Sequence, residues 1–446
     1  MGTLKQITSQ DLLRVMTDGI PLFGDRDEEA NTLYVHDIDL SESLTIRDLD
    51  MSISIAFCNC HFRGGVEFHG GTFQGISFNG GRITKPVMVY GGEFFGKFKI
   101  NQVNALEMDG DGLYSFAFMG GTFKSSIEIY KGAFQKLCFG AARAPHLTVK
   151  SGAVSSFNQG LEPGIKQLYI SVGYIDIMEF HDVSVNDLSL AGFLDKGVYA
   201  FNGLQVTSLA IENLVNLGQI HVSELTVCPV PPVTTQWEQP DRNAVSTLRI
   251  AHATLGAFLL SDLDLRNFQT IDIRHSNLTT IHAANVSWFD PPQISALGDL
   301  EQRDLYRQLK QAMIAQGNRI DEMRFHELEM TAYLNTLSYR KNFWDLVVLN
   351  IGRHTNRFGT DYIRPALLLV CTAVLFFLGS VWILGLSPFE KWGSLFVMLN
   401  PAHASDYLLP KAKLPNAFLA WDFLGRLCNS VLIFQFLTGF RKFIRR

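Results

Sequence analysis

The sequence repeats a short phrase in its first third: two glycines, one variable residue, and then a phenylalanine or an isoleucine. It occurs as Gly70–Phe73, Gly80–Ile83, Gly91–Phe94 and Gly120–Phe123, with a degenerate copy at Lys131–Phe134. The first three copies begin 10 and 11 residues apart, and such a period indicates a repeat architecture. Glycine pairs allow tight turns with positive φ. The apolar residue after each turn can then stack on its equivalent in the next repeat, so the phrase predicts a β-solenoid.

Short alternations of apolar and polar residues continue from about Thr32 to Phe289, and a period of two is typical of β-strands. The clearest are Leu33–Val35, Leu44–Ile46, Ile53–Ile55, Ile127–Ile129, Leu168–Ile170 and Leu248–Ile250. No amphipathic helix of normal length interrupts them, so alternating β and α units are not expected. A β-sandwich is an alternative, although sandwiches rarely run this long as one domain. We therefore expect a right-handed β-helix over residues 29–290.

A second period, of five residues, occurs twice. Phe68, Phe73, Phe78 and Ile83 are five apart, and so are Phe258, Leu263, Phe268, Ile273, Leu278 and Ala283. Asp262, Asn267, Asp272 and Asn277 directly precede four of the second set. An Asx residue before a central apolar residue, every fifth position, resembles the pentapeptide-repeat family of β-solenoids. The resemblance implies that the Asx side chains bond the backbone at the corners and that the apolar residues stack inside.

Two segments flank or interrupt the strands. Residues 1–28 read as a helical cap over the open end of the repeats, with Leu12, Leu13, Val15 and Met16 as its apolar face and Asp11 or Ser9 as its N-cap. The Pro-rich stretch from Cys228 to Pro240 interrupts the pattern and reads as an inserted loop. A functional alternative is that the loop binds a partner through Trp237.

Helical periodicity replaces the strands after Pro291–Pro292. Asp299–Gln316 places Leu305, Leu309, Ala312 and Met313 on one face, and Gly317–Asn318 ends it. A second helix begins near Arg319. We expect an antiparallel helical hairpin within residues 291–360, in the right place to couple the repeats to the apolar C-terminal segments.

Two apolar segments near the C-terminus predict transmembrane helices within residues 361–446. Ala366–Leu386 is 21 residues long without a charge, which is enough to cross a bilayer core. A second span is expected from about Phe418 to Phe440, although it contains Asp422, Arg426 and Gln435. Asp422 and Arg426 are four apart and could pair on one helical face. They sit either at the membrane interface or against a polar lumen or a neighbouring subunit.

Basic residues predict the orientation of the spans. Arg353, Arg357 and Arg364 precede the first span, and Arg441, Lys442, Arg445 and Arg446 follow the second. The connection has only Lys391, Lys411 and Lys413, so the positive-inside rule places both termini in the cytoplasm. The candidate anchors at the membrane interface are Arg364, Trp382, Trp392, Trp421, Arg441 and Lys442. Residues 1–28 contain no signal-peptide core, so we expect a multi-pass membrane protein whose repeats stay in the cytoplasm.

The connection Trp392–His403 is too apolar for an ordinary exposed loop and suggests a re-entrant or interfacial segment. Two-helix ion channels have the same order of segments: a span, a re-entrant segment, a second span and a basic tail. No potassium-filter sequence is present here. Four further motifs lie in residues 300–446: Tyr306–Lys310, Phe325–Met330, Phe358–Gly359 before Arg364–Pro365, and Phe440–Lys442. Through them this part resembles the C-terminal half of bacterial pentapeptide-repeat membrane proteins with a channel-like tail. The resemblance implies a multi-pass protein of the bacterial inner membrane.

Other chemistry has little support in the sequence. The net charge of −5 and the pI near 6.2 do not suggest nucleic-acid binding. Cys58, Cys60, His61 and His69 fit no standard zinc spacing, and Asp109–Gly112 lacks the other ligands of a calcium loop. Six cysteines without a disulfide framework suggest a reducing compartment. No nucleophile elbow, phosphate loop or metalloprotease helix occurs, so we expect no enzyme, metal or cofactor.

Two classes of function remain. In the first, the spans form homo-oligomers that make a pore or disrupt the membrane, gated by the cytoplasmic repeats, as would suit a stress or phage-defence effector. In the second, the spans tether a scaffold or sensor that binds a cytoplasmic protein partner. A two-span chain cannot enclose a pore alone, so the first class requires oligomerisation.

Overall fold

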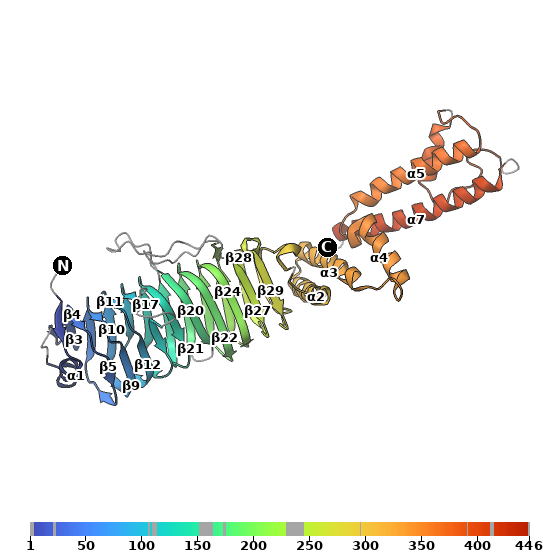
Figure 1. The fold of residues 1–446 in the computed structure, drawn as a ribbon. Helices are drawn as coiled ribbons and strands as arrows, with labels where there is room; N and C mark the ends of the chain where they lie inside the picture. Colours follow the sequence, from blue (N-terminus) through green and yellow to red (C-terminus); the bar gives the residue numbers. More distant parts are fainter. Residues whose placement is uncertain are drawn as a thin grey trace. The chain divides into compact units, whose positions relative to one another are not determined.

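The computed structural model describes the whole chain except residues 1–3, 21–23, 106–107, 109–113, 151–163, 173–174, 229–244, 295, 390, 411–413 and 445–446. The chain divides into two compact units, Met1–Leu297 and Gly298–Arg446. The first is rich in strands and the second is helical (Figure 1). Each unit is described by itself.

The first unit contains two long sheets, one of 12 and one of 18 strands among the described residues. The 12-stranded sheet contains β2 (Arg26–Asp27), β3 (Thr32–His36), β7 (Ser54–Cys58), β10 (Gly75–Asn79), β13 (Phe98–Asn101), β17 (Ser126–Tyr130), β19 (Ala144–Lys150), β21 (Ile175–His181), β23 (Val198–Asn202), β25 (Gln219–Ser223), β28 (Ala257–Asp264) and β30 (His282–Ser287).

The 18-stranded sheet contains β1 (Lys5–Ile7), β4 (Ile38–Leu40), β5 (Leu44–Ile46), β6 (Leu49–Asp50), β8 (His61–Phe62), β9 (Val66–Phe73), β11 (Arg82–Ile83), β12 (Val87–Phe94), β14 (Asn104–Ala105), β15 (Phe116–Phe118), β16 (Thr122–Phe123), β18 (Ala133–Phe139), β20 (Gly164–Val172), β22 (Ser184–Leu194), β24 (Gln205–Asn216), β26 (Thr226–Val227), β27 (Thr247–Ala251) and β29 (Thr270–Arg274). All six strands named from sequence alternation are confirmed.

Pairing within both sheets is parallel, apart from the antiparallel pair β2–β3. Thr32 pairs with Ser54, and Ser54 pairs with Gly75, so one repeat takes about 21 or 22 residues. In the 12-stranded sheet, three of the sequence intervals between paired residues of neighbouring strands are longer, and each contains residues outside the described ones. The longest separates Gln219 from its partner Ala257, and the Pro-rich stretch falls within it. The predicted loop, with Trp237, lies outside the described residues from position 229 onward.

One backbone turn recurs after nearly every strand of the 12-stranded sheet. At each turn one residue has a left-handed backbone, with φ between 49° and 72°. It directly follows a residue that pairs in register with the neighbouring strand. The ten described members are Asp37, Asn59, Gly80, Gln102, Lys131, Asp182, Gly203, Glu224, Asp262 and Asn285. Left-handed backbone disfavours most L-residues but is accessible to Gly, Asn and Asp, which make up seven of these ten. Adjacent members also bond: Asn59 Nδ2 donates to Asp37 Oδ1 over 2.5 Å.

The Gly-Gly phrases occupy two different corners of each repeat, not a single one. Gly71, Gly92 and Gly121 share one corner, with φ of 91°, 111° and 91°. Gly80–Gly81 lies at the other corner, where a Cβ on Gly81 would be 2.1 Å from the Cys60 carbonyl oxygen. The spacing of 10 and 11 residues is therefore half a repeat. The apolar residues after the glycines therefore belong to two columns, and each lies in register with its equivalent one repeat away.

The predicted aromatic stack is present within one column. The rings of Phe73 and Phe94 lie 5.0 Å apart, and those of Phe94 and Phe123 lie 4.5 Å apart and nearly parallel. Ile83 instead pairs in register with Phe62. The five-residue sets are buried as predicted, except Ala283, which is half-buried. Asn277 bonds the backbone N–H of Thr279 as the Asx reading requires, whereas Asp272 pairs with the Arg274 side chain.

The N-terminal helix α1 (Ser9–Asp18) buries Leu12, Val15 and Met16. Its N-cap is Thr8, not Ser9 or Asp11: the Thr8 hydroxyl accepts from the Asp11 N–H, and the Asp11 carboxylate accepts from the Thr8 N–H in a capping box. The short strand β1 before it pairs with β4, so the segment 1–28 is only partly helical.

The second unit begins with the predicted hairpin. Its helices are α2 (Asp299–Gln316) and α3 (Arg319–Thr336), with Gly317 at φ 70° between them. A buried ion pair joins them, from Lys310 Nζ to Glu329 Oε2 over 2.5 Å. The long apolar helices are α5 (Ile363–Ile383) and α7 (Asn416–Ile444), and the short α6 (Leu395–Met398) lies in their connection.

A further helix, α4 (Phe343–Asn356), was missed from the sequence. Its apolar residues face outward as well as inward, so no clean amphipathic stripe marks it. The 3₁₀ turns are η1 (Leu265–Asn267), η2 (Pro291–Ile294), η3 (Arg357–Gly359) and η4 (Trp392–Ser394). Residues 291–360 therefore hold three α-helices rather than a hairpin alone.

Candidate functional site

The two long apolar helices pack against each other in antiparallel register. Trp421 Nε1 donates to the Phe376 carbonyl oxygen over 3.0 Å, and Thr372 Oγ1 donates to Asn429 Oδ1 over 3.0 Å. Small residues allow the close approach: a Cβ on Gly425 would lie 2.9 Å from Cγ of Phe376. The start of α5 and the end of α7 therefore lie at the same end of the pair.

A buried carboxylate on α7 binds the connection between these helices. Asp422 on α7 is 2% exposed and accepts hydrogen bonds on both oxygens. Its Oδ1 lies 2.9 Å from Nε2 of His403 in the connection. Its Oδ2 accepts from Nε and Nη2 of Arg426, at 2.9 and 2.6 Å. Asp422 and Arg426 therefore pair along one helical face, as their spacing allows.

Other polar bonds continue the same cluster. His403 Nδ1 is 2.6 Å from the Asn400 carbonyl oxygen, so its ring is fixed from both sides. Asn429, one turn beyond Arg426, donates through Nδ2 to the carbonyl oxygen of Met398 over 2.8 Å. Met398 and Leu408 of the connection join an apolar core with Phe376, Phe377 and Phe418. The apolar stretch Trp392–His403 is thus packed onto α5 and α7.

Sequence reasoning missed His403, Asn429 and Thr372. His403 was read only as the end of an apolar segment, and its partner is 19 residues away. Asn429 lies seven residues after Asp422, on the same helical face as Arg426. That spacing, three polar side chains at intervals of four and three on an otherwise apolar helix, is the signal that could have found it.

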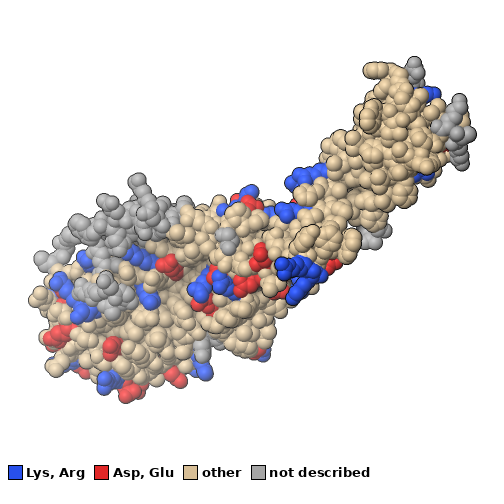
Figure 2. All heavy atoms as spheres, turned by 45° about the vertical axis from the view of Figure 1, so that its right-hand side comes forward, with Lys and Arg blue, Asp and Glu red and all other residues tan. Residues whose placement is uncertain are grey.

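The outer surfaces of α5 and α7 are apolar. Among their most exposed side chains are Leu367, Val370, Leu375, Trp382, Phe423, Leu427 and Phe434, each between 53% and 84% exposed. Both helices are long and apolar enough to cross a membrane. The face of this part seen in Figure 2 is mostly tan, with few charged side chains. Buried polar groups inside and exposed apolar groups outside invert the usual arrangement of a water-soluble helix pair.

The remaining predicted residues lie at the two ends of the pair. Trp382 is 84% exposed near the end of α5, and Trp392 is 51% exposed in the connection and packs edge-on against Phe377. Arg364 pairs with Asp361 at the opposite end, over 3.2 Å.

Gln435 is half-buried, and its backbone carbonyl oxygen accepts a hydrogen bond from Nδ2 of Asn356. Arg441 and Lys442 continue α7, but their side chains lie outside the described residues.

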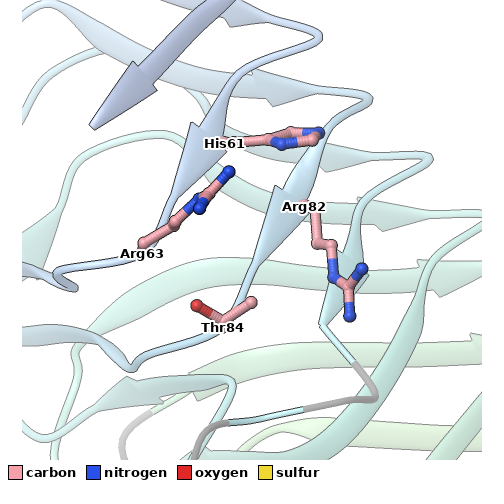
Figure 3. A pocket seen from close by; sticks show the side chains of 4 residues that line it. All are labelled: His61, Arg63, Arg82 and Thr84. Atoms are coloured by element: carbon pink, nitrogen blue, oxygen red, sulfur yellow. The ribbon is translucent and has the colours of Figure 1, made fainter. Parts of the chain in front are cut away.

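A surface hollow of about 370 Å³ lies on the strand unit, lined by His61, Arg63, Arg82 and Thr84 (Figure 3). Arg63 pairs with the nearly buried carboxylate of Asp39 over 2.8 Å. Burial is the main cause that lowers the pKa of His61. Asp39 acts in the opposite direction and raises this pKa, whereas Arg63 and Arg82 lower it further. The hollow is cationic, but residues 106–107 and 109–113, which follow the neighbouring strand β14, lie outside the described ones. No ligand is therefore assigned to it.

Two buried cysteines of the strand unit have thiols that resist deprotonation. Cys60 is 2% exposed, and burial raises the pKa of its thiol to about 12. Burial likewise raises the pKa of Cys138. Within the described parts of the chain, no group of three or more His, Cys, Asp or Glu side chains could hold a metal ion.

Comparison with known protein families, with characterised proteins and with solved structures finds no match to this chain. The resemblances drawn from the repeats and from the C-terminal motifs therefore remain predictions. The functional interpretation rests on the geometry of the chain alone.

Replacing Asp422 should release the connection from α7. In Asp422→Ala, His403 and Arg426 lose their shared acceptor, and breaking a buried charged pair costs about 3 kcal/mol of unfolding free energy. Limited proteolysis of the detergent-solubilised full chain should show faster cleavage between residues 387 and 415. Asp406→Ala, in the same connection but exposed, is the matched control and should leave the cleavage rate unchanged. Equal cleavage of the two variants would contradict the role of Asp422.

Proposed function

We propose that this chain is a membrane-anchored platform: a cytoplasmic β-solenoid held at the bacterial inner membrane by a self-contained hairpin of two transmembrane helices. In this proposal α5 and α7 cross the bilayer, and both chain ends stay on the cytoplasmic side. The solenoid presents its long sheet faces to a cytoplasmic protein partner. The observation that carries the proposal is that α5 and α7 are apolar outside and keep Asp422 and Asn429 buried and hydrogen-bonded inside.

Helix length and end composition support a membrane crossing. The 21 residues of α5 extend roughly 31 Å at 1.5 Å per residue, against a hydrocarbon core of about 30 Å. Trp382, Trp392 and Trp421 gather at the connection end, as expected of residues at a membrane interface. In hydrocarbon an unsatisfied carboxylate would be very unfavourable, so Asp422 must find its partners within protein.

The solenoid interpretation draws on the pairing of the first unit. Both sheets run parallel, and each repeat of about 21 residues contributes one strand to the 12-stranded sheet and one to three strands to the 18-stranded sheet. Left-handed residues recur at one corner and glycines at another. Phenylalanines from successive repeats stack within the unit. A regular surface of this kind is suited to extended protein partners, and none of its described side chains forms recognisable catalytic machinery.

Charges placed on the outer face of α5 should prevent stable membrane anchoring. Val370 and Leu375 are 55% and 58% exposed, and each arginine at the bilayer centre disfavours insertion by about 3 kcal/mol. We expect the full chain to resist alkaline extraction from bacterial membranes and V370R/L375R to be extracted.

The matched control is I314R/I320R, which alters two exposed apolar residues on α2 and α3 and should leave the chain in the membrane. Full extraction of the unaltered chain would overturn the proposal.

A second candidate is the oligomeric pore or membrane-disrupting effector. One observation favours it: the side chain of Arg426 is 27% exposed although Asp422 binds its Nε and Nη2. A partly exposed guanidinium on a transmembrane helix favours a polar neighbour, either water in a pore or another subunit. Because one hairpin cannot enclose a pore, this candidate requires a homo-oligomer.

Ion flux separates the two candidates. The effector predicts dye or ion release from liposomes that contain the full chain, and a changed rate in Arg426→Gln, because the exposed guanidinium is lost. Ser430→Ala, at a neighbouring exposed position on α7, is the control. A detergent-solubilised monomer with no flux under any condition would exclude the pore and leave the anchored platform.

A further inference from the structure

Helix α4 turns one set of its apolar side chains away from the rest of its unit, while Leu346, Val347 and Leu349 are half-buried. Trp344, Val348 and Ile351 are 75%, 65% and 42% exposed. They are spaced at intervals of four and three, so they form one stripe along the helix. Phe343 and Tyr339 extend the stripe at its start, with their rings 5.3 Å apart. The opposite side of α4 meets α3, α5 and α7.

The path of the backbone prevents α4 from continuing into α5. Arg357, Phe358 and Gly359 all have positive φ, at 48°, 58° and 88°, and this break turns the chain sharply between the two helices. Asn356, 1% exposed, fixes the turn: its Nδ2 donates to the Gln435 carbonyl oxygen, and its Oδ1 accepts from the Gly359 N–H. Figure 1 draws α4 inclined at a wide angle to α5 and α7, at the end where α5 begins.

The length and charge of α4 indicate which surroundings cover the stripe. Its 14 residues extend roughly 21 Å, which is too short to cross a bilayer. Arg340 and Lys341 precede it, and Arg353 and His354 lie in its last turn, whereas Asp345 is its one acidic residue. An apolar stripe with tryptophan, on a helix with cations at both ends and placed beside a transmembrane helix, is the composition of an interfacial helix.

We propose that α4 lies in the plane of the membrane, with Trp344, Val348 and Ile351 in the boundary between headgroups and acyl chains of an anionic leaflet. The inference rests on the proposed membrane crossing of α5 and α7. It adds a lipid-binding surface: Arg340, Lys341 and Arg353 meet anionic headgroups, and the lipid covers the outward stripe. The helix would thereby fix the height and tilt of the unit at the cytoplasmic surface.

Depth-dependent quenching tests this arrangement in the full chain. The accessible cysteines 58, 228, 371 and 428 are replaced by serine, and the buried Cys60 and Cys138 are kept. Single cysteines labelled with an environment-sensitive fluorophore are then introduced as Val348→Cys, Asp345→Cys and Leu375→Cys. The protein is reconstituted in phosphatidylcholine vesicles with or without an equal share of phosphatidylglycerol, with spin labels placed near the headgroup or near the acyl-chain end.

The label at position 348 should be quenched by the shallow spin label and shifted to the blue, more strongly in the anionic vesicles. Position 345, on the side of the same helix, should be quenched less, and position 375 should be quenched by the deep spin label. Equal quenching at 348 and 345, with deep quenching at 375, would overturn the inference and leave the membrane crossing intact.

Failure of quenching at position 375 would instead overturn the membrane crossing itself. Crosslinking of position 348 between two chains, without shallow quenching, would show that a second copy covers the stripe and would also overturn the inference. Substituting Arg340, Lys341 and Arg353 with glutamine should abolish the preference for phosphatidylglycerol. An undiminished preference in that variant would contradict the role of the three cations.

Discussion

The second unit depends on one carboxylate. Asp422 sits on an otherwise apolar helix, where charge is tolerated only if protein surrounds and satisfies it. His403 and Arg426 provide that satisfaction from the same chain, at 2.9 and 2.6 Å. Because His403 belongs to the connection, satisfying Asp422 also folds the connection onto α5 and α7. The hairpin is then complete in itself, with its polar atoms turned inward and its apolar side chains outward.

In the strand unit the equivalent constraint lies in the backbone. Parallel pairing in register requires each repeat to turn at the same places, and one turn uses a left-handed residue at almost every repeat. Where a second backbone runs within van der Waals distance, only glycine fits, as at Gly71 and Gly81. The parallel register continues across the longer intervals, as where Gln219 pairs with Ala257.

Local periodicity was enough to predict the strands, the α2–α3 hairpin and the two long apolar helices, because each carries its pattern within its own residues. That the Gly-Gly phrase serves two corners could not be predicted, since a spacing of half a repeat looks the same in sequence as a whole one. The bond between His403 and Asp422 could not be predicted, because the fold of the connection brings them together. Helix α4 was missed because its outward residues are apolar, which water would disfavour and a lipid surface would not.

The most direct test of the transmembrane hairpin is the side of the membrane on which each of its ends lies. A cysteine at Asp406 in the connection and one at Arg340 before α4 are introduced separately in the chain whose accessible cysteines are replaced by serine. Intact bacterial cells are treated with a thiol reagent that crosses the outer but not the inner membrane. A hairpin of two transmembrane helices predicts labelling of the cysteine at 406 and protection of that at 340 until the cells are opened. Protection or labelling of both sites in intact cells would contradict it.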